Sequence, residues 1–466
     1  MTRATKLVCT LGPASADRVP ELVEAGMDVA RINLTHGTRE DHEGLVRAVR
    51  EASAEAGRAV AVMTDLSGPK VRLGELDPDE VELVDGGRFV LRGGGGTGDV
   101  SGAPTSHQSL PAELEAGDRV LLSDGIVELR VEETTGDQVR TRVVRGGVIR
   151  SRAGVNVPSD RLGVPAITEK DERDLEWVRT AAVDLVAQSF VRRAVEVRAL
   201  ADLLRDEPAL LVAKIETGSA VEDAGAIIEA ADVVMVARGD LGVELPLERI
   251  PVIQKDLVDR ANRSGTPAIV ATQMLESMTE NRRPTRAEAG DVAGAAFDGA
   301  AGILLSAETA IGRYPVEAAR TASTILRTAE SEGARFVSAT IEERVEGTDA
   351  RAVAHAAATA AVDAGAVAVA CFTRTGLTAR LLSGVRLAVP IYAFSHEEAV
   401  VRRLAIFRGV HPKPCDPPED TDSMIEMMDR RLREEGLAAS GDPVVLVAST
   451  PVGRSRTNLL KVHRVG

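Results

Sequence analysis

The stretch Leu210-Leu211-Val212-Ala213-Lys214-Ile215-Glu216-Thr217-Gly218 decides the fold. Its apolar run is long enough for a buried parallel strand, and it ends abruptly in a cation, an anion and a glycine. Packing does not explain that ending, whereas a barrel strand that delivers chemistry at its carboxyl end does. The next apolar run, Val233–Ala237, ends in Arg238-Gly239-Asp240. Glu216 and Asp240 are therefore expected at one edge, either as a divalent-metal pair beside Lys214 or as partners in surface salt bridges.

The chain on both sides of this stretch alternates short aliphatic runs with amphipathic segments, the pattern of parallel βα units. The expected strands are Lys6–Leu11, Asp28–Leu34, Ala59–Leu66, Asp184–Phe190, Ala209–Glu216, Asp232–Ala237, Pro267–Thr272 and Ala301–Leu305. Eight such strands are the number that closes a (β/α)₈, or TIM, barrel. We therefore predict an α/β fold built on this barrel.

Two regions interrupt or extend that pattern. Between about residues 71 and 160, short runs alternate with period two between glycine-rich turns, which predicts a small antiparallel β domain inserted after the third strand. Near the C-terminus, a helix at Ala352–Ala364 precedes strands at Ala366–Phe372, Pro390–Phe394 and Pro443–Ala448, again an α/β pattern. The expected domains are 1–70 and 161–338 for the barrel, 71–160 for the insertion and 339–466 for the C-terminal unit.

Composition narrows the possible partners. A formal net charge of -15 and a pI near 5.2 argue against a nucleic-acid or anionic-membrane surface and favour small molecules or further copies of the chain. No apolar run approaches the ~20 residues of a membrane-spanning helix. The three cysteines, Cys9, Cys371 and Cys415, have neither zinc-site spacing nor an even number, so we expect reduced thiols in the cytoplasm.

Functional-looking polar residues gather where a barrel places its active site. They lie at or just past the carboxyl ends of the expected strands: Thr35, His36, Asp65, Ser189, Lys214, Glu216, Asp240, Thr272, Gln273, Ser306 and Glu308. Polar residues scattered for packing would not collect at one edge. Two carboxylates suit Mg²⁺, and nearby cations suit a phosphoryl group in transfer.

Lys214 also admits a Schiff-base role of the aldolase type. That chemistry needs a lysine away from carboxylates, whereas Lys214 lies two residues from Glu216 on the same strand face. A protonated lysine that acts as an electrostatic clamp fits the spacing better. Arg31, inside an otherwise apolar strand, and Arg72, just past the third strand, are the further cations of this edge.

The motifs together resemble those of the pyruvate kinase family over nearly the whole chain. They are KLVCTLGP (6–13), RINLTHG (31–37), DLSGPKVR (65–72), GVNVP (154–158), VPAITEKD (164–171), KIE (214–216), MVARGDLGV (235–243), ATQML (271–275), RPTRAE (283–288) and LSAETA (305–310). The resemblance implies phosphoryl transfer from phosphoenolpyruvate to ADP, giving pyruvate and ATP in the last step of glycolysis. It also implies that the β insertion is a lid, in the form of a small β-barrel, and that the C-terminal α/β unit is regulatory.

The resemblance assigns roles to individual residues. Glu216 and Asp240 would hold Mg²⁺ (or Mn²⁺), and Lys214 and Arg31 would neutralise the phosphoryl group. The phosphoenolpyruvate site would comprise Arg31, Ser189, Gly239, Asp240 and Thr272, with Thr272 also a candidate proton relay to the enolate. The nucleotide site would comprise Asn33, His36, Arg72 and, from the lid, Asp124 and Arg152. Arg152 stands one residue before the place where the family often has a lysine, here Ala153.

Lys70 is the departure with the clearest consequence. Many family members have a glutamate there and need K⁺, bound by the equivalents of Asn33, Thr35, Asp65 and the Leu66 carbonyl. Two monovalent cations about 4 Å apart repel by roughly 4 kcal/mol at an effective dielectric of 20. An ammonium at Lys70 would replace K⁺, as in the lysine-bearing bacterial-type members, so we expect no K⁺ requirement. The alternative is a lysine merely solvated on a loop.

In the C-terminal unit, Thr373, Arg374, Thr375, Gly376 and Thr378 stand between a strand and a helix, where backbone N–H groups and hydroxyls can cradle a phosphate. An ordinary βα turn with a threonine cap looks the same. The segment 450–457, with Arg454 and Arg456, would complete a pocket for a sugar phosphate or AMP. The family expectation is a homotetramer.

Two other functions share parts of the pattern. A metal-dependent barrel lyase acting on pyruvate or oxaloacetate would have the lysine and carboxylates, but no use for the inserted domain. A non-catalytic effector-binding relative would be expected to lose the edge residues, and all of them are present here.

Overall fold

The computed structural model describes residues 3–123, 125–158, 163–205, 207–333, 349–452 and 457–466. Its centre is a closed barrel of eight parallel strands in the order β1-β18-β17-β16-β15-β14-β3-β2. They are β1 (Lys6–Leu11), β2 (Val29–Asn33), β3 (Ala61–Asp65), β14 (Leu185–Val191), β15 (Leu210–Ile215), β16 (Val233–Ala237), β17 (Ala268–Ala271) and β18 (Gly302–Leu305). The predicted TIM barrel is confirmed, and the strands are almost entirely buried, as an aliphatic barrel core requires.

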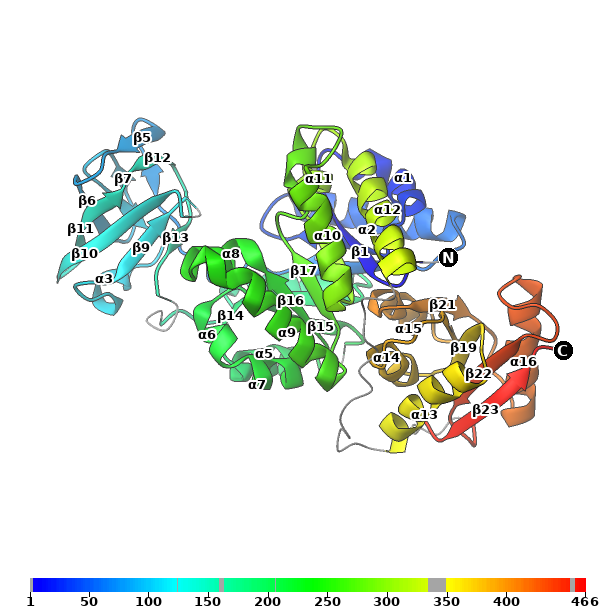
Figure 1. Cartoon of the computed structure of the whole chain (residues 1–466). Helices are drawn as coiled ribbons and strands as arrows, with labels where there is room; N and C mark the ends of the chain where they lie inside the picture. Colours follow the sequence, from blue (N-terminus) through cyan, green and yellow to red (C-terminus); the bar gives the residue numbers. More distant parts are fainter. Residues whose placement is uncertain (1–2, 124, 159–162, 206, 334–348, 453–456) are drawn as a thin grey trace.

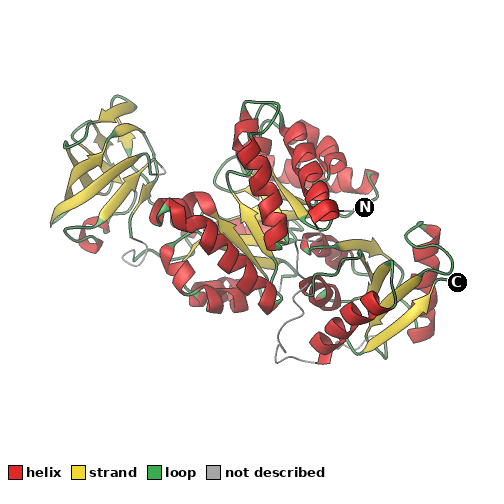
Figure 2. Cartoon of the chain, in the orientation of Figure 1, coloured by secondary structure: helices red, strands yellow, loops and turns green. Residues whose placement is uncertain are grey.

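Helices surround the barrel strands (Figure 2). The longer ones are α1 (Val19–Ala25), α2 (Arg39–Glu55), α4 (Glu169–Val178), α5 (Ala194–Leu203), α7 (Ala224–Ala230), α9 (Ile250–Ser264), α10 (Arg286–Asp298) and α12 (Pro315–Gly333). Capping boxes at Thr38, Thr168 and Thr285 fix where α2, α4 and α10 begin. Three further helices begin just after strands at the carboxyl edge: α6 (Gly218–Glu222), α8 (Arg238–Glu244) and α11 (Ala307–Ala310).

The region between β3 and α4 forms a separate β unit beside the barrel (Figure 1). Its six-stranded sheet has the order β13-β9-β10-β11-β6-β8, with two-stranded sheets β12-β5 and β4-β7. The strands are β4 (Glu75–Leu76), β5 (Glu80–Leu83), β6 (Arg88–Gly93), β7 (Thr97–Gly98), β8 (Gly102–Thr105), β9 (Arg119–Leu122), β10 (Val127–Thr135), β11 (Gln138–Arg145), β12 (Gly147–Arg150) and β13 (Val155–Asn156), with helix α3 (Leu110–Glu113). Alternate residues such as Phe89, Leu91 and Leu129 are fully buried, which explains the period-two pattern.

The C-terminal unit is a five-stranded sheet, β21-β20-β19-β22-β23, with helices on its faces. Its elements are α13 (Asp349–Asp363), β19 (Ala368–Phe372), α14 (Leu377–Gly384), β20 (Ile391–Ser395), α15 (Glu398–Arg403), β21 (Val410–Pro414), α16 (Thr421–Glu434), β22 (Pro443–Ala448) and β23 (Leu459–Arg464). Strands β21 and β23 were not predicted from the sequence. Both are edge strands, where the prolines of β21 and the polar residues of β23 are tolerated and no continuous apolar run is needed.

The C-terminal unit packs against the amino ends of the barrel strands. Lys6, at the start of β1, donates from Nζ to the carbonyl oxygen of Val410 over 2.6 Å. Asp184, just before β14, accepts from Arg402 Nε over 2.9 Å. The opposite, carboxyl edge faces the side on which the β unit stands (Figure 1). Within the described residues, no helix is long and apolar enough to cross a membrane.

Candidate active site

A buried lysine lies at the centre of the carboxyl edge. Lys214, the fifth residue of β15, has its Nζ atom 2.9 Å from Glu216 Oε1 and 3.2 Å from Asp65 Oδ1. It also donates to Ser189 Oγ over 2.7 Å. Three neighbouring strands, β3, β14 and β15, supply these partners, so the barrel closure itself creates the cluster. The predicted residues Lys214, Glu216, Asp65 and Ser189 are thus brought together.

A second cation reaches the same carboxylate from the other side. Arg31 on β2 donates from Nε to Asp65 Oδ2 over 2.8 Å, and its Nη2 lies 2.7 Å from that oxygen. Its Nη1 donates to Thr10 Oγ1 over 2.9 Å. Asp65 is only 1% exposed, while Arg31 and Lys214 are 12% and 11% exposed. Asp65 therefore fixes the positions of two largely buried cations at the edge.

Burial and charge act in opposite directions on these groups. Burial works to lower the pKa of Lys214, but Asp65 and Glu216 more than offset it and raise that pKa, so the ammonium is retained. Burial works against ionisation of Asp65, yet Lys214 and Arg31 hold its pKa below the usual value. Burial raises the pKa of Glu216, with added repulsion from Asp240 and Asp65. The negative charge of Glu216 is therefore less fully compensated than that of Asp65.

Asp240 supplies the second carboxylate of the predicted metal pair. It lies in the first turn of α8 and is 25% exposed. Its negative charge contributes to the raised pKa of Glu216, after burial. A divalent cation between them would relieve their repulsion, so these two residues fit Mg²⁺. No group of three or more His, Cys, Asp or Glu side chains that could hold a metal occurs among the described residues. Substrate and water oxygens would complete the coordination, which Mg²⁺ commonly accepts.

The loop after β17 adopts an unusual backbone that sequence did not indicate. Thr272 and Gln273 have φ angles of 71° and 54°, in the left-handed region that residues with a Cβ rarely occupy. Thr272 Oγ1 accepts from the Gly239 amide over 2.7 Å and donates to the Ala271 carbonyl over 2.6 Å. The two predicted substrate-binding groups, Gly239 and Thr272, therefore lie in direct contact.

Arg238 holds this loop in place, a role the sequence analysis missed. It donates from Nη2 to the Thr272 carbonyl over 2.6 Å, and its Nη1 donates to Asp291 Oδ1 over 2.7 Å. The residue is largely buried, at 11% exposure. An arginine directly after a fully apolar strand is a sequence signal for a buried ion pair, but its partner on α10 cannot be read from spacing.

The residues predicted for a monovalent cation form a second polar group beside Asp65. The Thr35 amide donates to Asn33 Oδ1 over 3.1 Å. The Ser189 hydroxyl lies 2.8 Å from the Leu66 carbonyl oxygen and 3.0 Å from Asp65 Oδ1. Lys70 Nζ lies 3.3 Å from Asp240 Oδ1 and 5.8 Å from the centre of the Phe190 ring. Lys70 is thus not simply solvated, since its ammonium contacts one of the two candidate metal ligands.

The candidate nucleotide residues lie in two places, the turn after β2 and the two connections to the inserted β unit. His36 is exposed in the turn after β2. Arg72 donates from Nη1 to the Arg152 carbonyl over 3.2 Å, where the two connections to the β unit run together. The Arg152 side chain pairs with Glu75 at 2.5 Å and is 76% exposed. Asp124 lies outside the described residues.

The predicted effector loop precedes α14. The Gly376 amide donates to Thr373 Oγ1 over 3.0 Å, and the Gly376 φ of 92° makes the turn into the helix. The hydroxyls of Thr378 and Thr457 lie 2.7 Å apart, which joins this loop to the end of the segment 450–457. Arg374 and Thr375 are exposed. Arg454 and Arg456 lie outside the described residues.

Comparison with known families gives two matches that cover most of the chain. Residues 2–319 match the family model described as the pyruvate kinase barrel domain. Residues 351–463 match the one described as the pyruvate kinase alpha/beta domain. The two matches correspond to the parallel barrel with its insertion and to the C-terminal sheet.

Individual relatives agree over the full length. A pyruvate kinase of Geobacillus stearothermophilus is 40% identical and aligns over 99% of this chain and 80% of its own length. One from Mycobacterium tuberculosis strain H37Rv is 41% identical over 100% of this chain and 99% of its own. A crystal structure of a pyruvate kinase from Cryptosporidium parvum superposes with a TM-score of 0.92 at 31% identity, covering 100% of this chain and 96% of that one.

Proposed function

Because the chain belongs to the pyruvate kinase family, we propose that it transfers the phosphoryl group of phosphoenolpyruvate to ADP, giving pyruvate and ATP. The observation that best supports this reaction is the pair of cations, Lys214 and Arg31, fixed on Asp65 beside Glu216. A phosphoryl group in transfer has little covalent chemistry for a protein to perform, so positioning and charge provide the rate enhancement. Two cations held before substrate arrives need no rearrangement as charge develops.

Glu216 and Asp240 would hold the Mg²⁺ (or Mn²⁺) that the family needs. When bound, the ion would add positive charge against the substrate oxygens. Lys214 Nζ lies 2.9 Å from Glu216 Oε1, so the ammonium and the ion would share one carboxylate. Ser189 accepts the Lys214 hydrogen bond and keeps the ammonium pointed at the edge.

Thr272 and the Gly239 amide would bind the substrate carboxylate. At present the two groups bond to each other over 2.7 Å, so an incoming carboxylate would take the place of that contact. Release of the phosphoryl group leaves the enolate of pyruvate, which must gain a proton on its methylene carbon. Thr272, whose hydroxyl already has a defined donor and acceptor, is the proposed relay, acting through neighbouring groups or water.

Asn33, His36 and Arg72 would bind the nucleotide, with Asp124 and Arg152 contributed by the inserted β unit. In this proposal the β unit closes over the site as a lid and excludes water that would otherwise accept the phosphoryl group. Arg152 would have to release Glu75 to reach a phosphate. That exposed ion pair is weak, because solvent screens it.

We also propose that the enzyme works without K⁺, because the Lys70 ammonium supplies a fixed positive charge next to Asp240. The loop formed by Thr373, Arg374, Thr375, Gly376 and Thr378 would bind a phosphorylated effector, either a sugar phosphate or AMP. A cytoplasmic homotetramer is the expected form, and the free thiols of Cys9, Cys371 and Cys415 accord with a reducing compartment.

One assay tests the reaction. The purified chain is mixed with phosphoenolpyruvate, ADP and Mg²⁺ in a buffer free of K⁺, and ATP and pyruvate are measured together. We expect both products in equal amounts, and none when Mg²⁺ is chelated. Pyruvate without ATP would indicate a different reaction, and absence of both products, in buffers with and without K⁺, would contradict the proposed function.

A further inference from the structure

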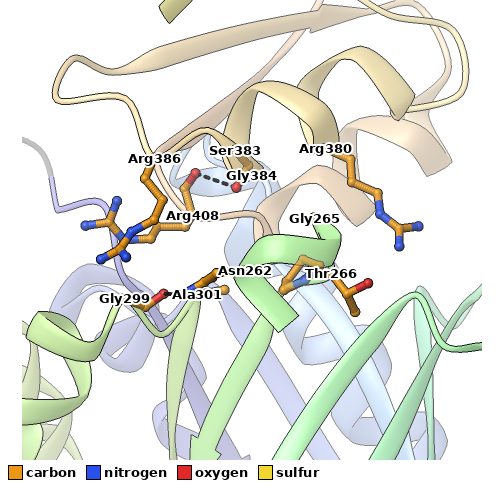
Figure 3. Close-up of a pocket in the computed structure, with 11 residues that line it drawn as sticks. Asn262, Gly265, Thr266, Gly299, Ala301, Arg380, Ser383, Gly384, Arg386 and Arg408 are labelled. Carbon is orange, nitrogen blue, oxygen red and sulfur yellow. Dashed lines mark hydrogen bonds between the residues drawn. The ribbon is translucent and has the colours of Figure 1, made fainter. Parts of the chain in front are cut away.

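A cavity lies at the junction of the barrel and the C-terminal unit (Figure 3). Its barrel residues Pro267 and Ala301 directly precede β17 and β18, so it lies at the amino ends of the strands, opposite the proposed active site. The space within it is about 280 Å³ when the part open to solvent is included, and the enclosed part is only about the size of one water molecule, so a bound group would lie in the open part. The barrel contributes the loop between α9 and β17 and the end of α10, and the C-terminal unit contributes the end of α14. The lining residues are Asn262, Gly265, Thr266, Pro267, Gly299, Ala301, Arg380, Ser383, Gly384, Arg386 and Arg408.

Two arginines of the C-terminal unit lie side by side in this cavity, Arg386 and Arg408 (Figure 3). Nε and Nη2 of Arg386 and Nε of Arg408 are buried without a hydrogen-bond partner among the described residues. Burial and the charge of Arg408 lower the pKa of Arg386, and burial lowers the pKa of Arg408. Buried guanidinium groups are normally paired, so neighbouring cations with free N–H groups call for a missing anion.

The carboxylates that act on these two arginines, Asp259, Asp298 and Glu330, already have other partners. Asp259 pairs with Arg263 at 2.9 Å. Glu330 is 4.0 Å from Arg408 Nη2, and it already accepts the amides of Ala4 and Thr5 over 2.7 and 2.6 Å. Asp298, which acts on Arg386 only electrostatically, is bonded to Gln254 and Lys255. The third arginine, Arg380, is paired with Asp232 at 2.9 Å and points away from the other two in Figure 3.

The backbone brings Arg386 to this position at a cost. Its φ of 51° places it in the left-handed region just after α14, where glycine is the usual residue. Its guanidinium lies against Gly299, whose missing side chain leaves the necessary room: a Cβ there would stand 2.3 Å from Arg386 Cζ. Both features aim the guanidinium between the end of α10 and Arg408.

We propose that Arg386 and Arg408 bind a phosphate group in this cavity and that the bound group links the C-terminal unit to the barrel. Two guanidinium groups match the charge of a phosphate dianion and its fork of oxygen acceptors. The hydroxyls of Ser383 and Thr266 are engaged with the carbonyls of Arg408 and Ile228, so the arginines supply the recognition. The site lies at the end of α14 remote from the Thr373–Thr378 loop, and it does not depend on the proposed activity.

The test compares thermal melting of the full chain with and without inorganic phosphate, at constant ionic strength in chloride. Wild type is compared with Arg386→Gln and with a control, Arg433→Gln, an exposed arginine of α16. Phosphate that binds elsewhere affects all three proteins equally. We expect the half-saturating phosphate concentration to rise at least tenfold in Arg386→Gln and not in the control. Equal phosphate responses in wild type and Arg386→Gln would overturn the proposal.

The same variants separate binding from a purely structural role. If Arg386 and Arg408 repel each other in the empty cavity, Arg386→Gln melts at a higher temperature than wild type when phosphate is absent. If Arg386 only balances the carbonyl end of α10, the variant melts lower and keeps the phosphate response, which contradicts the proposal.

A crystallographic measurement covers the case in which the variant does not fold. Wild-type crystals soaked in selenate, a tetrahedral dianion with an anomalous signal, should show a peak between Arg386 and Arg408, and an empty cavity would overturn the inference. Thermal melting in the presence of a sugar phosphate then shows whether the bound phosphate group belongs to a metabolite or is the free ion. A shift that depends on Arg386 points to a phosphorylated metabolite, and a response to inorganic phosphate alone points to the free ion.

Discussion

The Lys70 ammonium lies 3.3 Å from Asp240, one of the two carboxylates proposed to hold Mg²⁺. A lysine from the loop after β3 thus contacts the first turn of α8. A cation this close competes with a divalent ion for the same oxygen atoms. Because of this contact, the side chain expected to remove the K⁺ requirement should also affect the binding of Mg²⁺. The sequence alone does not indicate that link.

Replacement of Lys70 is expected to tighten divalent-metal binding in the absence of substrates. Lys70→Gln removes the competing charge but keeps a polar side chain of similar length. Mn²⁺ affinity, measured by electron paramagnetic resonance, should increase several-fold. Lys255→Gln, a change of an exposed lysine on α9, is the matched control. An unchanged or weaker affinity in Lys70→Gln would show that the ammonium does not oppose the metal.

The cation requirement is expected to follow Lys70. Wild type should have the same kcat in tetramethylammonium and K⁺ buffers. Lys70→Glu replaces the fixed cation with an anion and should lose most activity without K⁺ and regain it when K⁺ is added, because Asn33, Thr35, Asp65 and Leu66 still offer oxygens. Na⁺ added instead of K⁺ tests whether the rescue is specific. A wild-type enzyme that needs K⁺ would refute the expectation.

Removal of the central ammonium is expected to affect catalysis more than substrate binding. Lys214→Gln should lower kcat by two to three orders of magnitude, the usual loss when a preorganised charge-stabilising group is deleted. KM for phosphoenolpyruvate should change much less, since Arg31 remains on Asp65. Lys214→Arg keeps the charge and tests its exact position. A fall in kcat/KM caused only by KM would mean that Lys214 binds the ground state and transition state equally.

Arg238 is expected to act as a positioning residue through the Thr272 loop. Arg238→Gln removes the bond to the Thr272 carbonyl and the pair with Asp291. The loop would relax from its left-handed geometry, so KM for phosphoenolpyruvate should rise about tenfold, with a smaller fall in kcat. Asp291→Asn, which loosens Arg238 from the far side, should produce the same pattern more weakly. A loss of stability with unchanged KM would restrict Arg238 to packing.

Lys6 provides a test of pH-dependent stability at the barrel base. Burial lowers its pKa to about 8, although Asp28 opposes the shift. Between this value and the unfolded value of about 10.4, the unfolded chain holds a proton that the folded chain has released. The free energy of unfolding therefore increases with rising pH in this range. In that window, the free energy of unfolding of wild type should increase relative to that of Lys6→Met by about 1.4 kcal/mol per pH unit. Urea unfolding at several pH values measures the difference, and a constant difference would contradict the assigned pKa.

The sequence predicted the barrel closely because buried parallel strands are continuous apolar runs that end where polar residues begin. Strands β21 and β23 escaped because edge strands do not need that signal. The cluster of Lys214, Glu216 and Asp65 could be expected from strand ends alone. Sequence did not predict the contact of Lys70 with Asp240 or the ion pairs of Arg238 and Arg152. Long side chains reach residues that are distant in the sequence, and the spacing of residues along the chain does not indicate which ones.

Asp65 belongs to two groups at once. It anchors Lys214 and Arg31 for the phosphoryl group, and it stands among the oxygens proposed for a monovalent cation. A substitution that adapts one group to a new ionic environment therefore disturbs the geometry of the other. During evolution, the salt preference of such an enzyme and its catalytic rate would be inherited together, and a lineage that changes its intracellular cations would more readily alter the neighbouring position 70 than the shared aspartate.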